Sequence, residues 1–110
     1  MQRNMDLVRN ILMWIENSPS RWTVPPFSMG GFMPEQVAYH AHIMREDGLI
    51  EGSDRHSLTW KGREFLDLAR DQNRWNQAKI AIGKVGSAPL AVWMKVLNDL
   101  MLKELSAAVT

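Results

Sequence analysis

Apolar residues recur with a helical period in the first part of the chain. The repeat predicts a helix over residues 4–16 whose inward stripe consists of Met5, Val8, Leu12 and Ile15. The following residues should end this helix, because Pro19 has no N–H for the hydrogen-bond ladder. Residues 21–24 have the pattern of a short strand. The glycine-interrupted segment 27–33 predicts an irregular loop or an edge strand.

A second helical pattern covers residues 34–47, with an inward stripe of Val37, Ala41 and Met44. Pro34 suits the first turn, where its missing N–H costs nothing, and Gly48 suits the position just after the helix. Two short apolar runs, 49–51 and 57–60, flank a polar turn and predict a hairpin of two strands. A third helix is expected from Lys61 to about Ala69, with Phe65 and Leu66 on its apolar side.

Two more helices are predicted in the last third of the chain. The first is marked by Trp75, Ala78, Ile82 and Val85 and should end at residues 86–87. The second begins near Pro89, and its apolar residues are Leu90, Trp93, Val96, Leu97, Leu100, Met101 and Leu105. Such a wide apolar surface exceeds what one small core needs, so we expect part of it to meet a second copy in a homodimer. The five tryptophans are expected in the core.

The pattern therefore predicts a mostly helical α+β protein with a small antiparallel hairpin. With 110 residues, 45% of them hydrophobic, the chain is long enough for one core. We expect one domain over 1–110, with a core at 1–69 and a helical extension at 70–110. No cysteine is present, which excludes disulfides and suits a cytoplasmic protein. Neither a signal peptide nor an apolar run of membrane-spanning length is apparent, so no membrane association is expected.

The order helix, two-stranded wing, helix is that of the second half of a winged helix-turn-helix domain. The stretch VAYHAHIMREDGLI resembles many bacterial repressors, and LTWKGREFL resembles the step that follows the wing in that superfamily. Nearly the whole chain resembles a narrower group, the phage and prophage domain-of-unknown-function 2513 family. That resemblance rests on the segments 5–9, 35–40, 48–50, 58–60, 65–66, 70–71 and 75–76. It implies a fold and a phage or prophage context, and no activity.

A DNA-binding role would use the side of the 34–47 helix opposite its apolar stripe. The candidate contacts there are Gln36, Tyr39, His42 and Arg45, with Arg55 at the tip of the wing. Gln36 could pair with an adenine, and Tyr39 or His42 could contact phosphate or a base edge. Arg55 and His56 could reach a minor groove, or they could be ordinary polar turn residues. The leading hypothesis is therefore a transcriptional regulator that binds double-stranded DNA.

Two features favour a different role. Residues 34–63 carry four basic and five acidic groups, whereas phosphate neutralisation by Lys and Arg supplies most non-specific DNA affinity. The place of the first helix of the helix-turn-helix is occupied by PPFSMGG, whose prolines and glycines cannot form a long helix. The alternative is a protein–protein interaction module, such as a phage accessory protein, built on a degenerate winged helix.

Chemistry-bearing residues are sparse. His40 and His42 point about 200° apart on a helix, so they cannot hold one ion, and His40 is expected to be a structural histidine. With three histidines and no cysteine, no metal site is predicted. His56-Ser57 lacks the orienting acid of a nucleophilic site, and Gly30-Gly31 is not followed by the Lys-Ser/Thr of a phosphate-binding loop. We therefore predict a protein that is not an enzyme and uses no cofactor.

Overall fold

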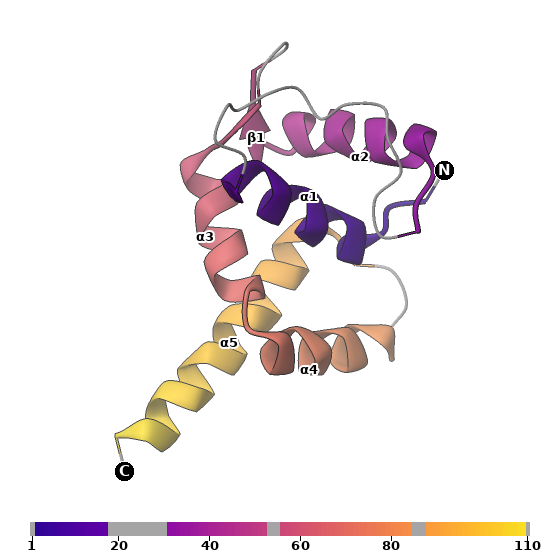
Figure 1. The fold of residues 1–110 in the computed structure, drawn as a ribbon. Helices are drawn as coiled ribbons and strands as arrows, with labels where there is room; N and C mark the ends of the chain where they lie inside the picture. Colours follow the sequence, from indigo (N-terminus) through magenta and orange to yellow (C-terminus); the bar gives the residue numbers. More distant parts are fainter. Residues whose placement is uncertain (1, 18–30, 53–55, 85–87, 110) are drawn as a thin grey trace. The chain divides into compact units, whose positions relative to one another are not determined.

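The computed structural model describes residues 2–17, 31–52, 56–84 and 88–109. These residues form five helices and one two-stranded antiparallel sheet (Figure 1). In chain order the elements are α1 (Met5–Asn17), α2 (Pro34–Glu46), β1 (Ile50–Glu51), β2 (Ser57–Leu58), α3 (Trp60–Ala69), α4 (Gln72–Gly83) and α5 (Leu90–Ala108). The mostly helical fold with a small hairpin after the second helix is confirmed.

The chain divides into two compact units, residues 1–66 and residues 67–110. Each is described by itself, and their union into one domain stays a prediction. Several predicted features lie outside the described residues: the strand at 21–24, the glycine and proline segment 25–30, Arg55 and Val85. Within the described part of the chain, no helix is long and apolar enough to cross a membrane.

The core of the first unit lies where α1 packs against α2 and the hairpin (Figure 1). The predicted stripe of α1 is confirmed, because Met5, Val8, Leu12 and Ile15 are buried. The stripe of α2, the helix that packs against α1, is confirmed as well, because Val37, Ala41 and Met44 are buried. Asn4 caps α1, its side-chain oxygen accepting hydrogen bonds from the backbone N–H groups of Asp6 and Leu7 at 3.0 and 3.2 Å.

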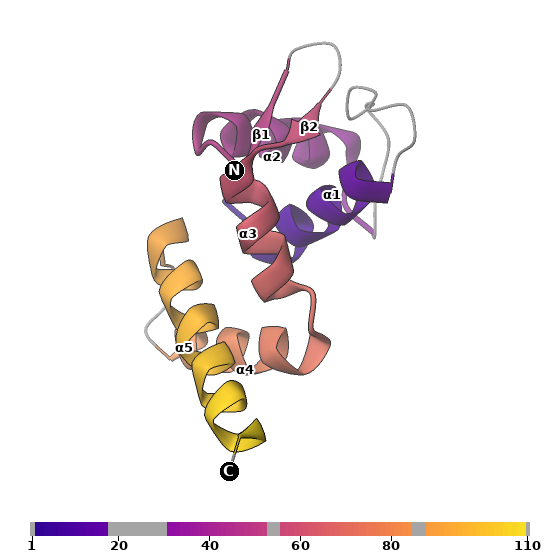
Figure 2. The same cartoon turned by 90° about the vertical axis from the view of Figure 1, so that its left-hand side faces the viewer.

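The turn from α2 into the hairpin is set by backbone geometry. Gly48 has a φ of +81°, the left-handed conformation that ends many helices and that glycine adopts without strain. The two strands then pair with Ile50 opposite Leu58 and Glu51 opposite Ser57 (Figure 2). Leu49, Ile50 and Leu58 are buried, so the hairpin contributes to the core although each strand has only two residues.

Thr59 and Gly62 hold the start of helix α3 close to the beginning of the hairpin. The Thr59 hydroxyl accepts the N–H of Gly62 at 2.9 Å and lies within hydrogen-bond distance of the carbonyls of Gly48 and Leu49. A Cβ atom added to Gly62 would lie 2.0 Å from the backbone oxygen of Leu49. Only glycine therefore allows α3 to approach the chain this closely.

The prediction for Trp60 was wrong in two respects. It was placed at the end of a strand and in the core, whereas it is the first residue of α3 and 76% exposed. The reason is the cap at Thr59, which starts the helix earlier and turns position 60 away from the buried stripe of Phe65, Leu66 and Ala69. Of the other tryptophans, Trp75 and Trp93 are buried and Trp14 is half-buried, while Trp22 lies outside the described residues.

The second unit is built from α4 and α5. The rings of Trp75 and Trp93, one from each helix, lie 5.0 Å apart between centroids, and both are buried. Ala78 and Ile82 complete the predicted stripe of α4 among the described residues. Helix α4 ends at Gly83, earlier than predicted, and α5 begins directly after its N-cap residue Pro89.

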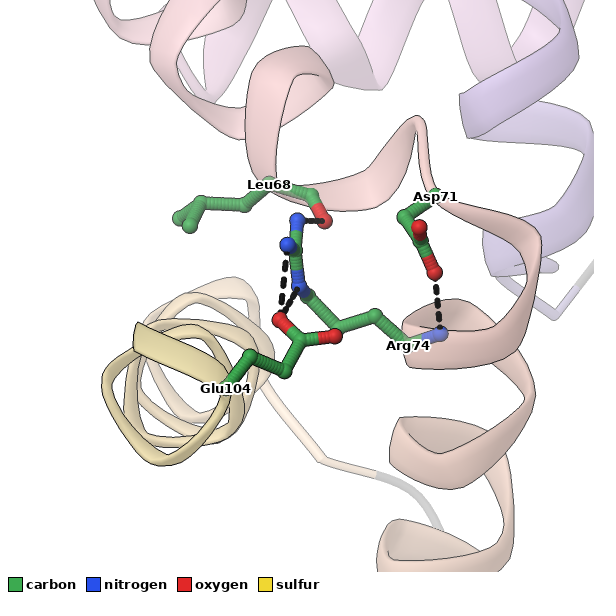
Figure 3. A network of polar contacts seen from close by, with 4 residues as sticks. All are labelled: Leu68, Asp71, Arg74 and Glu104. Carbon is green, nitrogen blue, oxygen red and sulfur yellow. Dashed lines mark hydrogen bonds and ion pairs between the residues drawn. The ribbon is translucent and has the colours of Figure 1, made fainter. Parts of the chain in front are cut away.

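A half-buried arginine, Arg74, links the two helices of this unit (Figure 3). Asp71 caps α4 by accepting the backbone N–H of Arg74 at 2.8 Å. The Arg74 guanidinium donates to Glu104 on α5 at 2.7 and 2.8 Å and to the backbone oxygen of Leu68 at 2.9 Å. Because one planar group satisfies a carboxylate and a carbonyl together, it fixes the contact between α5 and the start of α4.

Candidate macromolecule-binding surface

The outward face of α2 is the surface on which the predicted DNA contacts lie. Since Val37, His40, Ala41 and Met44 face the core, the opposite side of the helix faces solvent. Its exposed residues are Glu35, Ala38, His42, Arg45 and Glu46. The face carries two carboxylates, one guanidinium and one imidazole, which is a poor charge balance for a polyanion.

One of the two polar atoms of the Gln36 amide is already engaged within the helix cap. Its side-chain oxygen accepts the backbone N–H of Met33 at 2.9 Å. This bond is the half of a capping box in which the third helical residue satisfies the residue before the helix. A contact from Gln36 to adenine through both amide atoms would therefore break the N-terminal cap of α2.

Tyr39 and His42 have different surroundings. Tyr39 is half-buried, and its ring meets that of His40 edge to face, with centroids 5.5 Å apart. His42 is exposed, and its Nε2 atom lies 2.7 Å from the carboxylate of Glu46 one turn later. A ligand that contacts the His42 ring would therefore also lie next to the carboxylate of Glu46.

Arg45 stabilises the start of the hairpin turn. Its guanidinium donates to the backbone oxygen of Gly52 at 3.2 Å, which joins the end of α2 to the end of β1. The side chain stays exposed, so it remains accessible to a ligand from the solvent side. The structure thus places Gln36, Tyr39, His42 and Arg45 on one helix, whereas Arg55 lies outside the described residues.

His40 is a structural histidine, as predicted. Its Nδ1 atom lies 2.7 Å from the backbone oxygen of Gln36, and its Nε2 atom accepts the backbone N–H of Asn4 at 2.8 Å. These partners require the neutral ring with the proton on Nδ1. Burial lowers the pKa of His40; the hydrogen bond to Gln36 opposes this shift, and the nearby charge of Arg3 adds to it. Sequence reasoning could not find Asn4 as the partner, because it is 36 positions away.

The expectation that His56 is an exposed polar turn residue or a wing tip was wrong. Only 4% of His56 is exposed, and its Nδ1 atom has no hydrogen-bond partner among the described residues. The physical reason is its position at the base of the hairpin, directly before β2, whose Leu58 belongs to the core. His56 is therefore not available to a nucleic acid.

Trp60 is the surface residue that the sequence analysis missed. Its indole N–H donates to the carboxylate of Glu64 at 2.6 Å, one helical turn later, which holds the exposed ring in place. The signal was present in the spacing of α3. Counted as a helical residue, position 60 lies about 140° from Phe65 and 180° from Ala69, which puts it opposite the core.

Several cations of the first unit bind groups of their own chain. Arg3 pairs with the carboxylate of Asp47 at 3.1 Å, and the Lys61 ammonium donates to the backbone oxygen of Asp47 at 3.0 Å. The described residues of this unit carry five basic and seven acidic side chains, a balance of −2. They include no cluster of three metal-ligating side chains. This charge balance suits the surface to polar and aromatic contacts more than to phosphate binding.

Comparison with known proteins identifies the family. Residues 2–88 match the family model described as "Hypothetical protein (DUF2513)". A Haemophilus influenzae protein, described as uncharacterized, is 39% identical over 93 residues, which cover 74% of this chain and 79% of the relative. No solved structure is significantly similar to the chain. The family expected from the residues is thereby confirmed: the chain belongs to the DUF2513 family.

Proposed function

We propose that this protein is a non-enzymatic binding module whose first unit recognises another protein. The observation that carries the proposal is Trp60, a large aromatic side chain that is 76% exposed. Tryptophan is the residue type most enriched among the side chains that dominate binding energy at protein interfaces. An exposed tryptophan on an otherwise well-packed unit is therefore the strongest single indication of a binding surface.

The hydrogen bond from the indole to Glu64 supports the same role. At 2.6 Å it restricts the side chain to one orientation before any partner arrives. A side chain that is already ordered loses less conformational entropy on binding, which favours affinity. The partner we expect has an apolar pocket for the ring, with polar groups around it that suit Glu64 and the neighbouring Arg63, which is exposed.

The biological setting follows from the sequence resemblance and is part of the proposal. We infer a phage or prophage accessory protein on a degenerate winged helix, acting in the cytoplasm, which a chain without cysteine suits. A winged-helix scaffold does not by itself fix the ligand, because function depends on the residues of the site.

The test compares two variants that each remove one large exposed apolar side chain. Partners of the full chain are captured by affinity purification from cells that produce it, and each is then purified and titrated by calorimetry. Trp60→Ala should weaken the interaction about tenfold or more, whereas Ile80→Ala, a matched exposed residue of the second unit, should leave it unchanged. Equal affinities of the wild type and Trp60→Ala would overturn the proposal.

DNA binding is the second candidate, and one observation favours it. Arg45 joins the C-terminal end of α2 to the hairpin through the Gly52 oxygen, so helix and wing form one connected edge that also carries His42. The test is fluorescence anisotropy with mixed-sequence duplex DNA at low and near-physiological salt. Binding that falls steeply with salt and weakens in Tyr39→Ala/His42→Ala would favour the DNA role over the protein role. Absence of binding at low salt would exclude a general DNA-binding function.

A further inference from the structure

The outward side of α5 carries a row of four exposed residues: Val92, Lys95, Asp99 and Leu102. They follow one another at steps of three, four and three residues, which keeps them within an arc of about 80° on a helix. Leu90, Trp93 and Leu97, which are buried, lie on the opposite side. We call the four exposed residues the α5 seam.

All four members of the α5 seam are accessible. Val92 is 39% exposed and Leu102 is 50% exposed, although both are apolar. The side chains of Lys95 and Asp99 are 77% and 57% exposed, and they pair with each other at 3.3 Å within the helix. The seam therefore has apolar residues at its two ends and one charge of each sign between them.

This order of residues is complementary to itself when the helix is reversed. In an antiparallel pair centred level with residue 97, Lys95 of one copy lies opposite Asp99 of the other, and Val92 lies opposite Leu102. The two-fold axis repeats both contacts, as in any isologous interface.

We propose that the α5 seam binds a second copy of this chain in an antiparallel arrangement. A parallel pair is disfavoured, because it would place Lys95 against Lys95 and Asp99 against Asp99. The charges thus select the direction, and the apolar ends supply the buried area. Four residues on each helix bury less area than the interface of a permanent dimer. We therefore expect a weak and reversible dimer.

This inference goes beyond the proposed function and does not depend on Trp60. Every residue invoked for the homodimer lies on α5, so none of them belongs to the residues that carry the proposed function. Trp60→Ala should accordingly weaken partner binding and leave dimerisation unchanged. Each proposal can therefore fail while the other stands.

The experiment is sedimentation equilibrium of the full chain over a concentration series that reaches about 1 mM. The wild type should form a reversible dimer that weakens as salt is raised. Lys95→Asp and Asp99→Lys should each be monomeric over the same range, because each opposes like charges in the pair. An equimolar mixture of these two variants should form a heterodimer, and the double variant Lys95→Asp/Asp99→Lys should regain the homodimer.

Lys79→Asp, an exposed charge reversal on α4 outside the seam, serves as the matched control and should dimerise like the wild type. Circular dichroism of every variant checks that the helices are retained. A wild type that stays monomeric to about 1 mM would overturn the proposal. So would a dimer that survives Lys95→Asp, or a mixture of the two single variants that stays monomeric.

Discussion

The two units of this protein are stabilised in different ways. In residues 1–66, contacts that involve the backbone hold the elements in place. They are the cap of α1 at Asn4, the hydrogen bond from the Asn4 N–H to His40, the left-handed turn at Gly48 and the close approach of Gly62 to Leu49. In residues 67–110, α4 and α5 are joined by large side chains: the neighbouring rings of Trp75 and Trp93, and the ion pair of Arg74 with Glu104.

The surfaces of the units differ accordingly. The described part of the first unit exposes two large apolar side chains, Met33 and Trp60, whereas that of the second exposes Ile80, Val92, Leu102, Leu105 and Val109. The first unit carries seven basic and eight acidic residues, and the second carries six and four. A two-helix unit has a high ratio of surface to volume, so it cannot bury all of its apolar residues. Its surplus is therefore the better candidate for self-association.

The largest expected effect tests which tryptophans stabilise the fold. Trp75→Ala should lower the free energy of unfolding by about 3–5 kcal/mol, because it removes a fully buried ring from the core of the second unit. Trp60→Ala removes the same side chain from the surface of the first unit and should change stability by less than about 0.5 kcal/mol. Urea unfolding followed by circular dichroism measures both. Equal losses would contradict the assignment of one ring to the core and the other to the surface.

The next effect tests the backbone contact of the first unit. Gly62→Ala should cost about 1–3 kcal/mol, because the added methyl group would overlap the Leu49 oxygen and α3 must move away. Gly83→Ala is the matched control in the second unit, where nothing lies within 4 Å of the new Cβ. It should be neutral or stabilise α4 by up to about 1 kcal/mol. A Gly62→Ala protein as stable as the wild type would show that α3 does not depend on this approach.

A smaller effect is expected from the polar contact of the second unit. Arg74→Ala should destabilise by about 1–2 kcal/mol, since the arginine is only 14% exposed and its loss leaves the Leu68 oxygen and Glu104 without their partner, although Glu104 is partly solvated. Arg70→Ala, which disrupts the exposed pair with Asp67, should cost less than about 1 kcal/mol. Thermal unfolding of the two variants gives the comparison. A larger loss for Arg70→Ala would contradict the role of Arg74 between α4 and α5.

The smallest effect is a pH dependence of the first unit. Because the pKa of His40 in the folded protein lies below its ordinary value of 6.5, the unfolded chain binds more protons as the pH falls below that value. The contribution of His40 to stability is therefore complete above pH 6.5 and is lost progressively as the pH falls toward the folded pKa. His40→Gln should flatten this part of the stability profile, which urea unfolding at a series of pH values measures. Identical profiles would remove His40 as the cause.

Much of the fold followed from spacing alone. The stripes of α1 and α2, Pro34 at the start of α2 and Gly48 after it are local patterns whose physical causes lie within a few residues. The candidate surface was less predictable. Gln36, Tyr39 and His42 were expected on the side of α2 away from its apolar stripe, and the structure exposes only His42 there, leaving the other two half-buried. The cap from Gln36 to Met33 was not expected from the pattern of α2.

The errors share a physical origin. Trp60 and His56 were assigned from their residue types. The burial of His56 depends on its place directly before β2, and the exposure of Trp60 depends on where the hairpin ends and α3 begins. That boundary is decided by the Thr59 hydroxyl, which faces carbonyls ten and eleven positions earlier in the chain. Contacts over such distances carry no periodic signal.

The amino-acid sequence by itself determined the family, the helices with their inward stripes, and the absence of thiol and disulfide chemistry. Local hydrogen bonding and hydrophobic periodicity are sufficient for the helices and their stripes, because both depend on residues a few positions apart. Only the tertiary structure decided that His40 receives the N–H of Asn4, that Gly62 lies against Leu49, and that Trp60 faces solvent while Trp75 does not. These depend on how elements far apart in the chain pack, and packing is a property of the whole fold.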